Sequence, residues 1–203
     1  ALYPEGHDVI QGHSGRTLLR CAARSGNHDL TQRIIALVPE SQRLQCVMLQ
    51  DTISNTALHD AARSGNFECF TAILLLYPQA QHSQALNMRS VDKKTILHYA
   101  VESKNVACVK AILSLYPESQ RQQVVNTQDN LGKTIFHGTL TMVGVVNIAC
   151  IDTILALCPD PERWRALTLQ DIDGCTVLHH VAKSGNSAYF DINWLKAILS
   201  HYP

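Results

Sequence analysis

The chain lacks the features of membrane proteins and of nucleic-acid-binding proteins. No run of eighteen apolar residues occurs in its 203 residues, so the sequence holds no candidate membrane-spanning helix. Seventeen basic and seventeen acidic side chains cancel, so no overall electrostatic field attracts nucleic acid or anionic lipid. We therefore expect a partner that is recognised locally, and neither a nucleic acid nor a membrane.

The chain also lacks the common spacings of metal-binding and disulfide-forming residues. No C-x-x-C pair occurs among its seven cysteines, and its ten histidines form no H-x-x-x-H or H-E-x-x-H pair. An odd number of cysteines on mostly apolar stretches indicates free thiols in a reducing compartment such as the cytoplasm. We expect no cofactor and no bound metal.

One short pattern recurs five times: a threonine, two apolar residues, and usually a histidine. The threonines are Thr17, Thr56, Thr95, Thr134 and Thr176, and subtracting successive numbers gives spacings of 39, 39, 39 and 42. A threonine before small and aliphatic residues is typical of a helix N-cap. A period in this range indicates stacked units that bury a shared core.

The first full unit, residues 14–51, predicts three helices. Gly26 can adopt the positive φ that ends a first helix, and Leu30, Ile34, Ile35 and Leu37 form the apolar stripe of a second. Pro39 ends this second helix and opens a short third one at its first position, with Glu40 at the favourable positive end. The fold class predicted is therefore all-α.

The same plan divides the chain into units at 14–51, 52–89, 90–129, 130–171 and 172–203, with residues 1–13 as the tail of a preceding unit or an N-terminal cap. In the third helices, one column should be buried: Cys46 and Val47, Ala85 and Leu86, Val124 and Val125, Ala166 and Leu167. A basic row should face solvent: Arg43, His82, Arg121 and Arg163. Because both chain ends fall at the same point of the repeat, we expect a segment of a longer protein.

The segments at 129–137 and 171–179 resemble the ankyrin-repeat signature D-x-x-G-x-T-P-L-H, and residues 55–66 are similar to its helical continuation. Two departures stand out. The signature proline is replaced in every unit, and each unit is about six residues longer than the usual ankyrin length of 33. The long units with Leu-Tyr-Pro-Glu-Ser-Gln-Arg also resemble ankyrin effectors that intracellular bacteria deliver into host cells.

The resemblance implies an ankyrin-repeat solenoid that binds a protein partner and is not an enzyme. In that family the turns and one face of the first helices line a concave groove. The corresponding candidates for partner binding are Arg24, Asp60, Arg63, Lys93, Lys94, Tyr99, Glu102, Lys133, His180 and Lys183. Aromatic and arginine side chains commonly anchor protein interfaces. The alternative for these residues is that they are exposed without binding anything. The alternative function of the chain is to serve as the substrate-docking arm of an enzyme whose catalytic domain lies outside this segment.

The recurring histidines, His59, His98, His137 and His179, are expected to hold the turns and helix starts, because that is their role in the family. Cys69, Cys108 and Cys150 occupy equivalent positions and should be buried. Cys175 lies near His179 and His180, which leaves nucleophilic cysteine chemistry as a remote alternative.

The last two units depart from the regular period. Extra residues at 141–147 and 187–193 predict enlarged loops, which are either a binding surface or tolerated drift. Trp194, Leu195 and Ile198 should contact further chain or a second copy. In the first unit, Arg20 replaces the histidine and adds polarity typical of a terminal cap.

Overall fold

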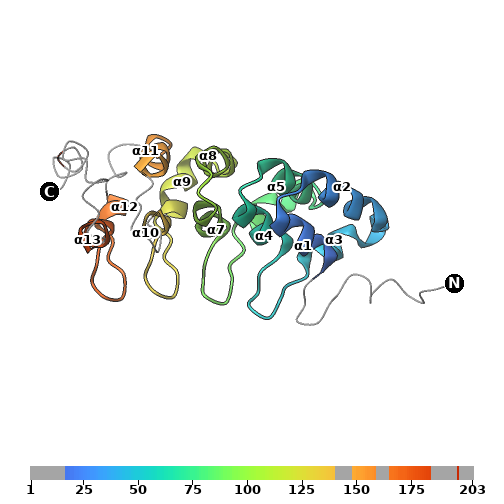
Figure 1. Ribbon diagram of the computed structural model, residues 1–203, viewed down its shortest axis with the longest axis horizontal. Helices are drawn as coiled ribbons and strands as arrows, with labels where there is room; N and C mark the ends of the chain where they lie inside the picture. Colours follow the sequence, from blue (N-terminus) through green and yellow to red (C-terminus); the bar gives the residue numbers. More distant parts are fainter. Residues whose placement is uncertain (1–16, 140–147, 159–164, 184–195, 197–203) are drawn as a thin grey trace. The chain divides into compact units, whose positions relative to one another are not determined.

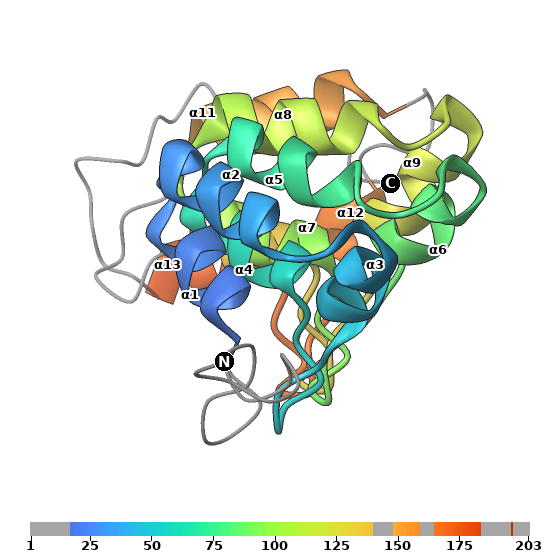
Figure 2. The ribbon, with the colours of Figure 1, turned by 90° about the vertical axis from the view of Figure 1, so that its right-hand side faces the viewer.

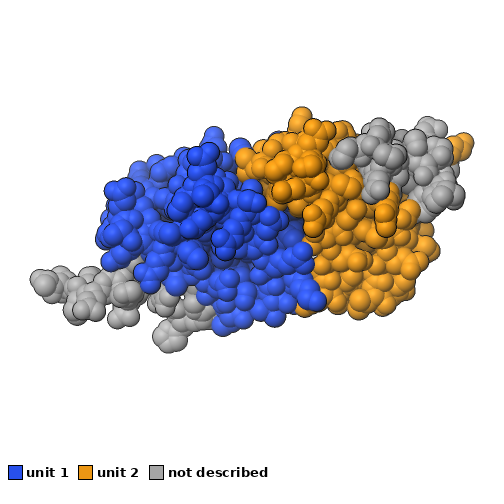
Figure 3. Space-filling model, turned by 180° about the vertical axis from the view of Figure 1, so that it is seen from behind, with its two compact units in different colours: residues 1–108 blue, residues 109–203 orange. Residues whose placement is uncertain are grey.

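A computed structural model describes residues 17–139, 148–158, 165–183 and 196, which form helices joined by turns (Figure 1). The chain divides into two compact units, residues 1–108 and 109–203 (Figure 3). The described residues contain no β-strand, and the sole strand-like pairing among them is one bridge between Arg89 and Thr95. The all-α fold class is confirmed.

In unit 1 the helices follow the predicted order of three per repeat. They are α1 (Leu18–Ser25), α2 (His28–Leu37), α3 (Glu40–Met48), α4 (Ala57–Ser64), α5 (Phe67–Leu74), the 3-10 helix η2 (Gln79–Gln81), α6 (His82–Leu86) and α7 (Ile96–Glu102). Helix α8 (Val106–Ser114) contains the boundary between the units. Unit 2 continues with α9 (Glu118–Val125), α10 (Ile135–Gly138), α11 (Ile148–Ala156), α12 (Arg165–Thr168) and α13 (Val177–Lys183).

The recurring threonines cap the first helix of their repeats, as predicted. The Thr17 hydroxyl oxygen accepts a hydrogen bond from the Arg20 N–H at 3.2 Å. Thr56, Thr95 and Thr134 form capping boxes, in which the histidine three residues later accepts the threonine N–H in return. The structural role predicted for the motif histidines is confirmed at His59, His98 and His137.

The first helices of unit 1 pack side by side through small residues. Helix α4 lies between α1 and α7, and α5 packs against α2 and α4. Ala23, Ala57, Ala61 and Ala62 are fully buried, which lets the helix backbones approach closely. In Figures 1 and 2, α2 and α5 lie above α1 and α4, and the turn between α3 and α4 extends below them.

Helix α2 corrects one prediction about the core. Thr31 and Ile35 are its buried residues, whereas Leu30 and Leu37 are exposed. Residues 30, 34 and 37 and residues 31, 35 and 38 both have helical spacing, so the sequence offers two stripes. The second stripe is the one that packs.

The third helices confirm the buried column and correct the basic row. Each pair predicted to be buried is buried. Helix α3 begins at Glu40, with Pro39 just outside it as N-cap rather than as its first residue. Arg43 and Arg121 donate from Nε to the carbonyls of Val38 and Tyr116, at 3.2 and 3.1 Å, and His82 Nε2 lies 3.0 Å from the Tyr77 carbonyl. These half-buried side chains therefore hold the turn before the third helix instead of only facing solvent.

Within each unit, successive turns are joined by main-chain hydrogen bonds. The Val91 N–H donates to the Ile53 carbonyl at 2.9 Å in unit 1, and the Ile172 N–H donates to the Leu131 carbonyl at 3.0 Å in unit 2. Gly132 has φ +70°, and a Cβ there would lie 2.9 Å from the Asp171 and Ile172 backbones. Glycine is required at this position because the neighbouring turn comes so close.

Several predictions fall on residues that the structure does not describe. They concern residues 1–13, the loops at 141–147 and 187–193, Arg163, and the contact expected at Trp194, Leu195 and Ile198. Among the residues that are described, no helix has the length and apolar character needed to cross a bilayer.

Candidate partner-binding surface

A buried ion cluster joins the first two repeats of unit 1. Arg20 donates from Nη2 to Asp51 and from Nε to Asp60, both at 2.7 Å, and its side chain is 4% exposed. Arg24 Nη1 lies 3.5 Å from Asp60 Oδ1, and the Arg24 side chain is 55% exposed. Arg20 is therefore a buried link between the first two repeats, and the role of the first repeat as a terminal cap stays a prediction.

The two carboxyl groups of this cluster respond differently to their surroundings. Burial raises the pKa of Asp60, and the attraction of Arg20 and Arg24 offsets this only in part. Burial also acts to raise the pKa of Asp51, but the hydrogen bonds from Arg20 and from the backbone outweigh it, so the net shift is downward. Asp60 thus depends on its arginine partners to remain ionised.

A second cluster is built on Tyr99, between α4 and α7. Lys94 Nζ donates to Glu102 Oε1 at 2.6 Å, and Arg63 Nη2 forms an ion pair with Glu102 Oε2 at 2.8 Å. Both cations also lie over the Tyr99 ring, 5.3 and 5.8 Å from its centroid, within the range of cation–π attraction. The ring also meets the His59 ring edge-on, with the two centroids 5.4 Å apart.

The structure changes the role of two of the residues predicted to bind a partner. Tyr99 and Asp60 were expected at the surface, but each is only 4% exposed. Small residues on the neighbouring helices let the next repeat come close enough to cover the position after the motif histidine. These two residues instead position Arg24, Arg63 and Lys94, whose charged ends reach the surface.

The remaining predicted residues lie at turns or helix ends. Lys93 is exposed at the turn before α7 with φ +59°, and Lys133 is half-buried in the turn before α10. Lys183 is exposed at the end of α13. His180 is half-buried and its Nε2 lies 2.6 Å from Asp171 Oδ2, so it belongs to a separate cluster in unit 2.

Sequence reasoning missed an apolar residue at each described turn tip. The four tip residues are exposed: Ile53 and Val91 in unit 1, Leu131 and Ile172 in unit 2. The sequence did contain a signal for them, because an apolar residue recurs in each of the four turns at a position where polar side chains are usual. Exposed aliphatic side chains beside cations are suited to contacts with another protein.

The cysteines lie where packing, rather than reactivity, explains them. Cys69, Cys108 and Cys150 are buried, as predicted, and burial raises the pKa of Cys108 and of Cys150 to about 11. The Cys175 thiol points toward the Asp173 carbonyl at 3.9 Å. Its two neighbouring histidines make other contacts, His179 with Thr176 and His180 with Asp171, so the geometry does not favour a cysteine nucleophile activated by either ring.

Comparison with known families agrees with this architecture. A family model for three ankyrin repeats matches residues 21–129, which is more than half of the chain. The chain belongs to the ankyrin-repeat family. Repeats of this family are generally protein–protein interaction modules and are typically not enzymes. No curated protein matches the chain significantly.

Proposed function

We propose that this chain is a non-enzymatic module that binds a protein partner through the surface formed in unit 1 by α1, α4, α7 and the turns before α4 and α7. This is the face that lines the concave groove in ankyrin repeats. The observation that carries the proposal is the cluster on Tyr99, where a buried ring and one carboxylate hold two cations in fixed positions. Side chains ordered before binding lose less entropy when a partner binds.

The charges of this surface favour an acidic segment of the partner. Arg63 and Lys94 share the single carboxylate of Glu102, so their cluster carries a net positive charge. Arg24 and Lys93 add two exposed cations on the same helices and turns. Ile53 and Val91 at the tips supply apolar contact area. A partner segment that combines carboxylates with an apolar side chain would match both features.

The test compares partner capture by matched charge variants. Arg24→Gln with Lys93→Gln removes two exposed charges from the proposed surface, and glutamine places no second carboxylate beside the buried Asp60. Arg33→Gln with Lys110→Gln makes the same change in net charge on α2 and α8. We expect the first variant to bind the captured partner about tenfold more weakly, because two exposed charge contacts are lost. The control variant should bind like the wild type.

Melting temperature and helical content must be equal in the three proteins for this comparison to count. Equal binding by both variants would show that the partner uses another surface, and the apolar tips of unit 2 would then be tested next. The long Leu-Tyr-Pro-Glu-Ser-Gln-Arg units favour a host-cell protein as the partner. Capture experiments run in parallel on lysates of eukaryotic host cells and of bacteria would distinguish a host-cell partner from a bacterial one.

A further inference from the structure

We propose that His137, Asp171 and His180 form a binding site in unit 2 for a divalent transition-metal ion such as Zn²⁺. The three side chains come from α10, from the turn before α13 and from α13 itself. One ligand atom from each lies within 4.8 Å of the other two. His137 and Asp171 are buried and His180 is half-buried, so an ion could enter from the His180 side.

The residues at the same three repeat positions also contact one another in the first two repeats, where one of the three, Arg20, is itself a cation. Arg20 corresponds to His137, Asp51 to Asp171, and Asp60 to His180, by their places relative to the motif threonines. In unit 1 the Arg20 guanidinium bonds both carboxylates at 2.7 Å. In unit 2 a carboxylate is again present, but its two neighbours are imidazoles, which can share a bound cation.

The donor set is one that borderline metal ions prefer. Two imidazole nitrogens and one carboxylate oxygen suit zinc better than magnesium or calcium, which favour oxygen ligands. Three protein ligands leave at least one coordination position for water or a partner's side chain. The site would therefore connect two neighbouring repeats and keep a position open toward solvent.

Asp171 is held so that one oxygen is available for the ion. Its Oδ1 accepts the N–H groups of Asp173 and Cys175 at 3.0 and 2.9 Å, which fixes the carboxylate in the turn. Its Oδ2 faces His180 Nε2 at 2.6 Å. Around a tetrahedral zinc, ligand atoms about 2.0–2.1 Å from the metal are roughly 3.4 Å apart. Small side-chain rotations would therefore open this pair and close the distance to His137.

Metal binding through His137 has a cost that limits the affinity. The Thr134 N–H donates to His137 Nδ1 at 3.1 Å, which places the ring hydrogen on Nε2, facing the Cys175 carbonyl at 3.3 Å. Ligation by Nε2 moves that hydrogen to Nδ1, where the Thr134 hydroxyl oxygen at 3.0 Å can accept it. The bond from the Thr134 N–H is lost. We expect micromolar rather than nanomolar zinc affinity.

The test is a calorimetric titration of the 203-residue chain with Zn²⁺ in four forms: wild type, D171N, H180Y and H179Q. D171N keeps the Oδ1 acceptor that the turn needs and removes the carboxylate. H180Y introduces the side chain that Tyr99 has at the equivalent position. H179Q is the matched control, because His179 is exposed, adjacent in sequence, and replaceable by glutamine in its capping role.

We expect one zinc per chain in the wild type and in H179Q, and affinity at least about 100-fold weaker in D171N and H180Y, since even outer-shell changes cost 10–100-fold. Zinc should raise the melting temperature of the wild type and of H179Q, and leave that of D171N and H180Y unchanged. A Co²⁺ derivative should show no sulfur-to-metal charge-transfer band. Absence of one-to-one binding, undiminished binding in D171N, or a thiolate band would each overturn the proposal.

Discussion

Arg20 stands where the later repeats have histidine, and its guanidinium is shared between the carboxylates of Asp51 and Asp60. Removing it would leave Asp60 buried without its main partner. We predict that Arg20→Ala lowers the free energy of unfolding by about 3–5 kcal/mol, the range for breaking a buried ion pair. Urea denaturation monitored by circular dichroism measures this change.

The control for this prediction is Arg33→Ala, on α2. Arg33 pairs with Asp29 at 3.0 Å, but their side chains are 75% and 76% exposed. An exposed pair of this kind contributes little, so the control should match the wild type closely. Equal losses in the two variants would mean that the Arg20 cluster contributes no more than an exposed pair.

His59 makes the stability of unit 1 depend on pH. Burial lowers its pKa to about 4, and the Met88 carbonyl opposes the shift. Because the unfolded chain, with a histidine pKa near 6.5, takes up a proton first, stability is complete above that pKa and declines as the pH falls toward 4. We predict a loss from His59 of about 2 kcal/mol between about pH 7.5 and about pH 5.

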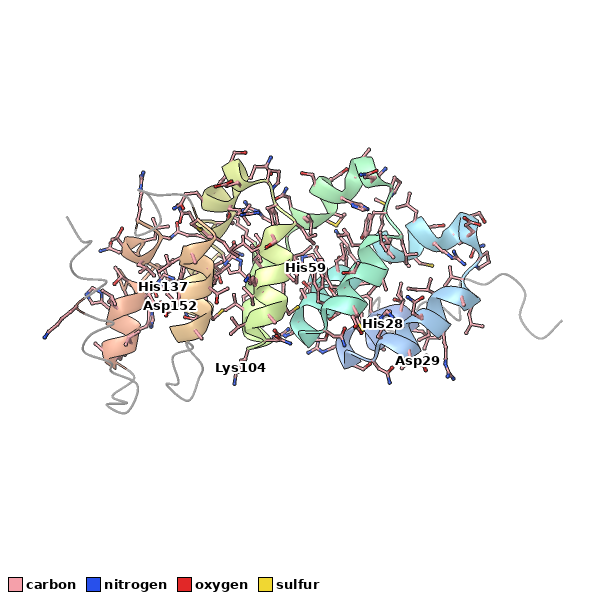
Figure 4. All side chains as sticks on the ribbon, turned by 90° about the horizontal axis from the view of Figure 1, so that it is seen from above. His28, Asp29, His59, Lys104, His137 and Asp152 are labelled. Carbon is pink, nitrogen blue, oxygen red and sulfur yellow. The ribbon has the colours of Figure 1, made fainter. Side chains whose placement is uncertain are left out.

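His59→Gln tests this, because glutamine keeps the capping box with Thr56 and does not titrate. Urea unfolding at both pH values should show a smaller loss in the variant than in the wild type. The labelled His59 lies within the packed side chains in Figure 4, as its burial requires. An identical loss in both proteins would assign the pH dependence to other groups.

At the scale of the element, the end of α7 differs from the ends of α1 and α4. Gly26 and Gly65 end the earlier helices with positive φ. The corresponding residue after α7 is Lys104, which is labelled in Figure 4, and its φ is +63°. A side chain is strained in this region. We predict that Lys104→Gly raises the free energy of unfolding by about 1 kcal/mol, measured by thermal or urea denaturation.

The converse substitution provides the comparison. Gly65 has φ +74°, and a Cβ there would lie 2.9 Å from the Ser103 hydroxyl oxygen and 3.1 Å from Asn105 Cβ. Gly65→Ala should therefore destabilise the chain. If Lys104→Gly is also destabilising, the lysine side chain makes contacts that outweigh its backbone strain.

At the scale of the whole molecule, the repeat period was the most informative feature of the sequence. It predicted the capped first helices, the third helices and the buried cysteines, because equivalent positions have equivalent surroundings in a stacked array. It could not show that Arg43 and Arg121 bond the carbonyl five residues earlier, since hydropathy places any cation at the surface. It also could not show how deeply the next repeat covers Tyr99.

The same reasoning explains why the cluster in unit 2 was missed. Comparing motif histidines with one another places successive rings about 10 Å apart, near the upper end of helix-packing distances. The close pair is instead His137 with His180, one residue beyond the motif, and their ring centroids are 5.6 Å apart. Contacts between unlike positions of neighbouring repeats require coordinates, because the repeat period aligns like positions and does not show which unlike positions touch. The structure shows the same pair of positions in contact for Arg20 with Asp60 and for His59 with Tyr99.

In the turns, the backbone aligns neighbouring repeats through main-chain hydrogen bonds, whereas the side chains at the tips are left to contact a partner. The Val91 N–H to Ile53 carbonyl bond, and its counterpart between Ile172 and Leu131, are formed by backbone atoms alone. The alignment of neighbouring turns in each unit is thus insensitive to which side chains the tips carry. Mutation can therefore exchange Ile53, Val91, Leu131 or Ile172 and change what the tips recognise, while the scaffold that presents them is inherited intact.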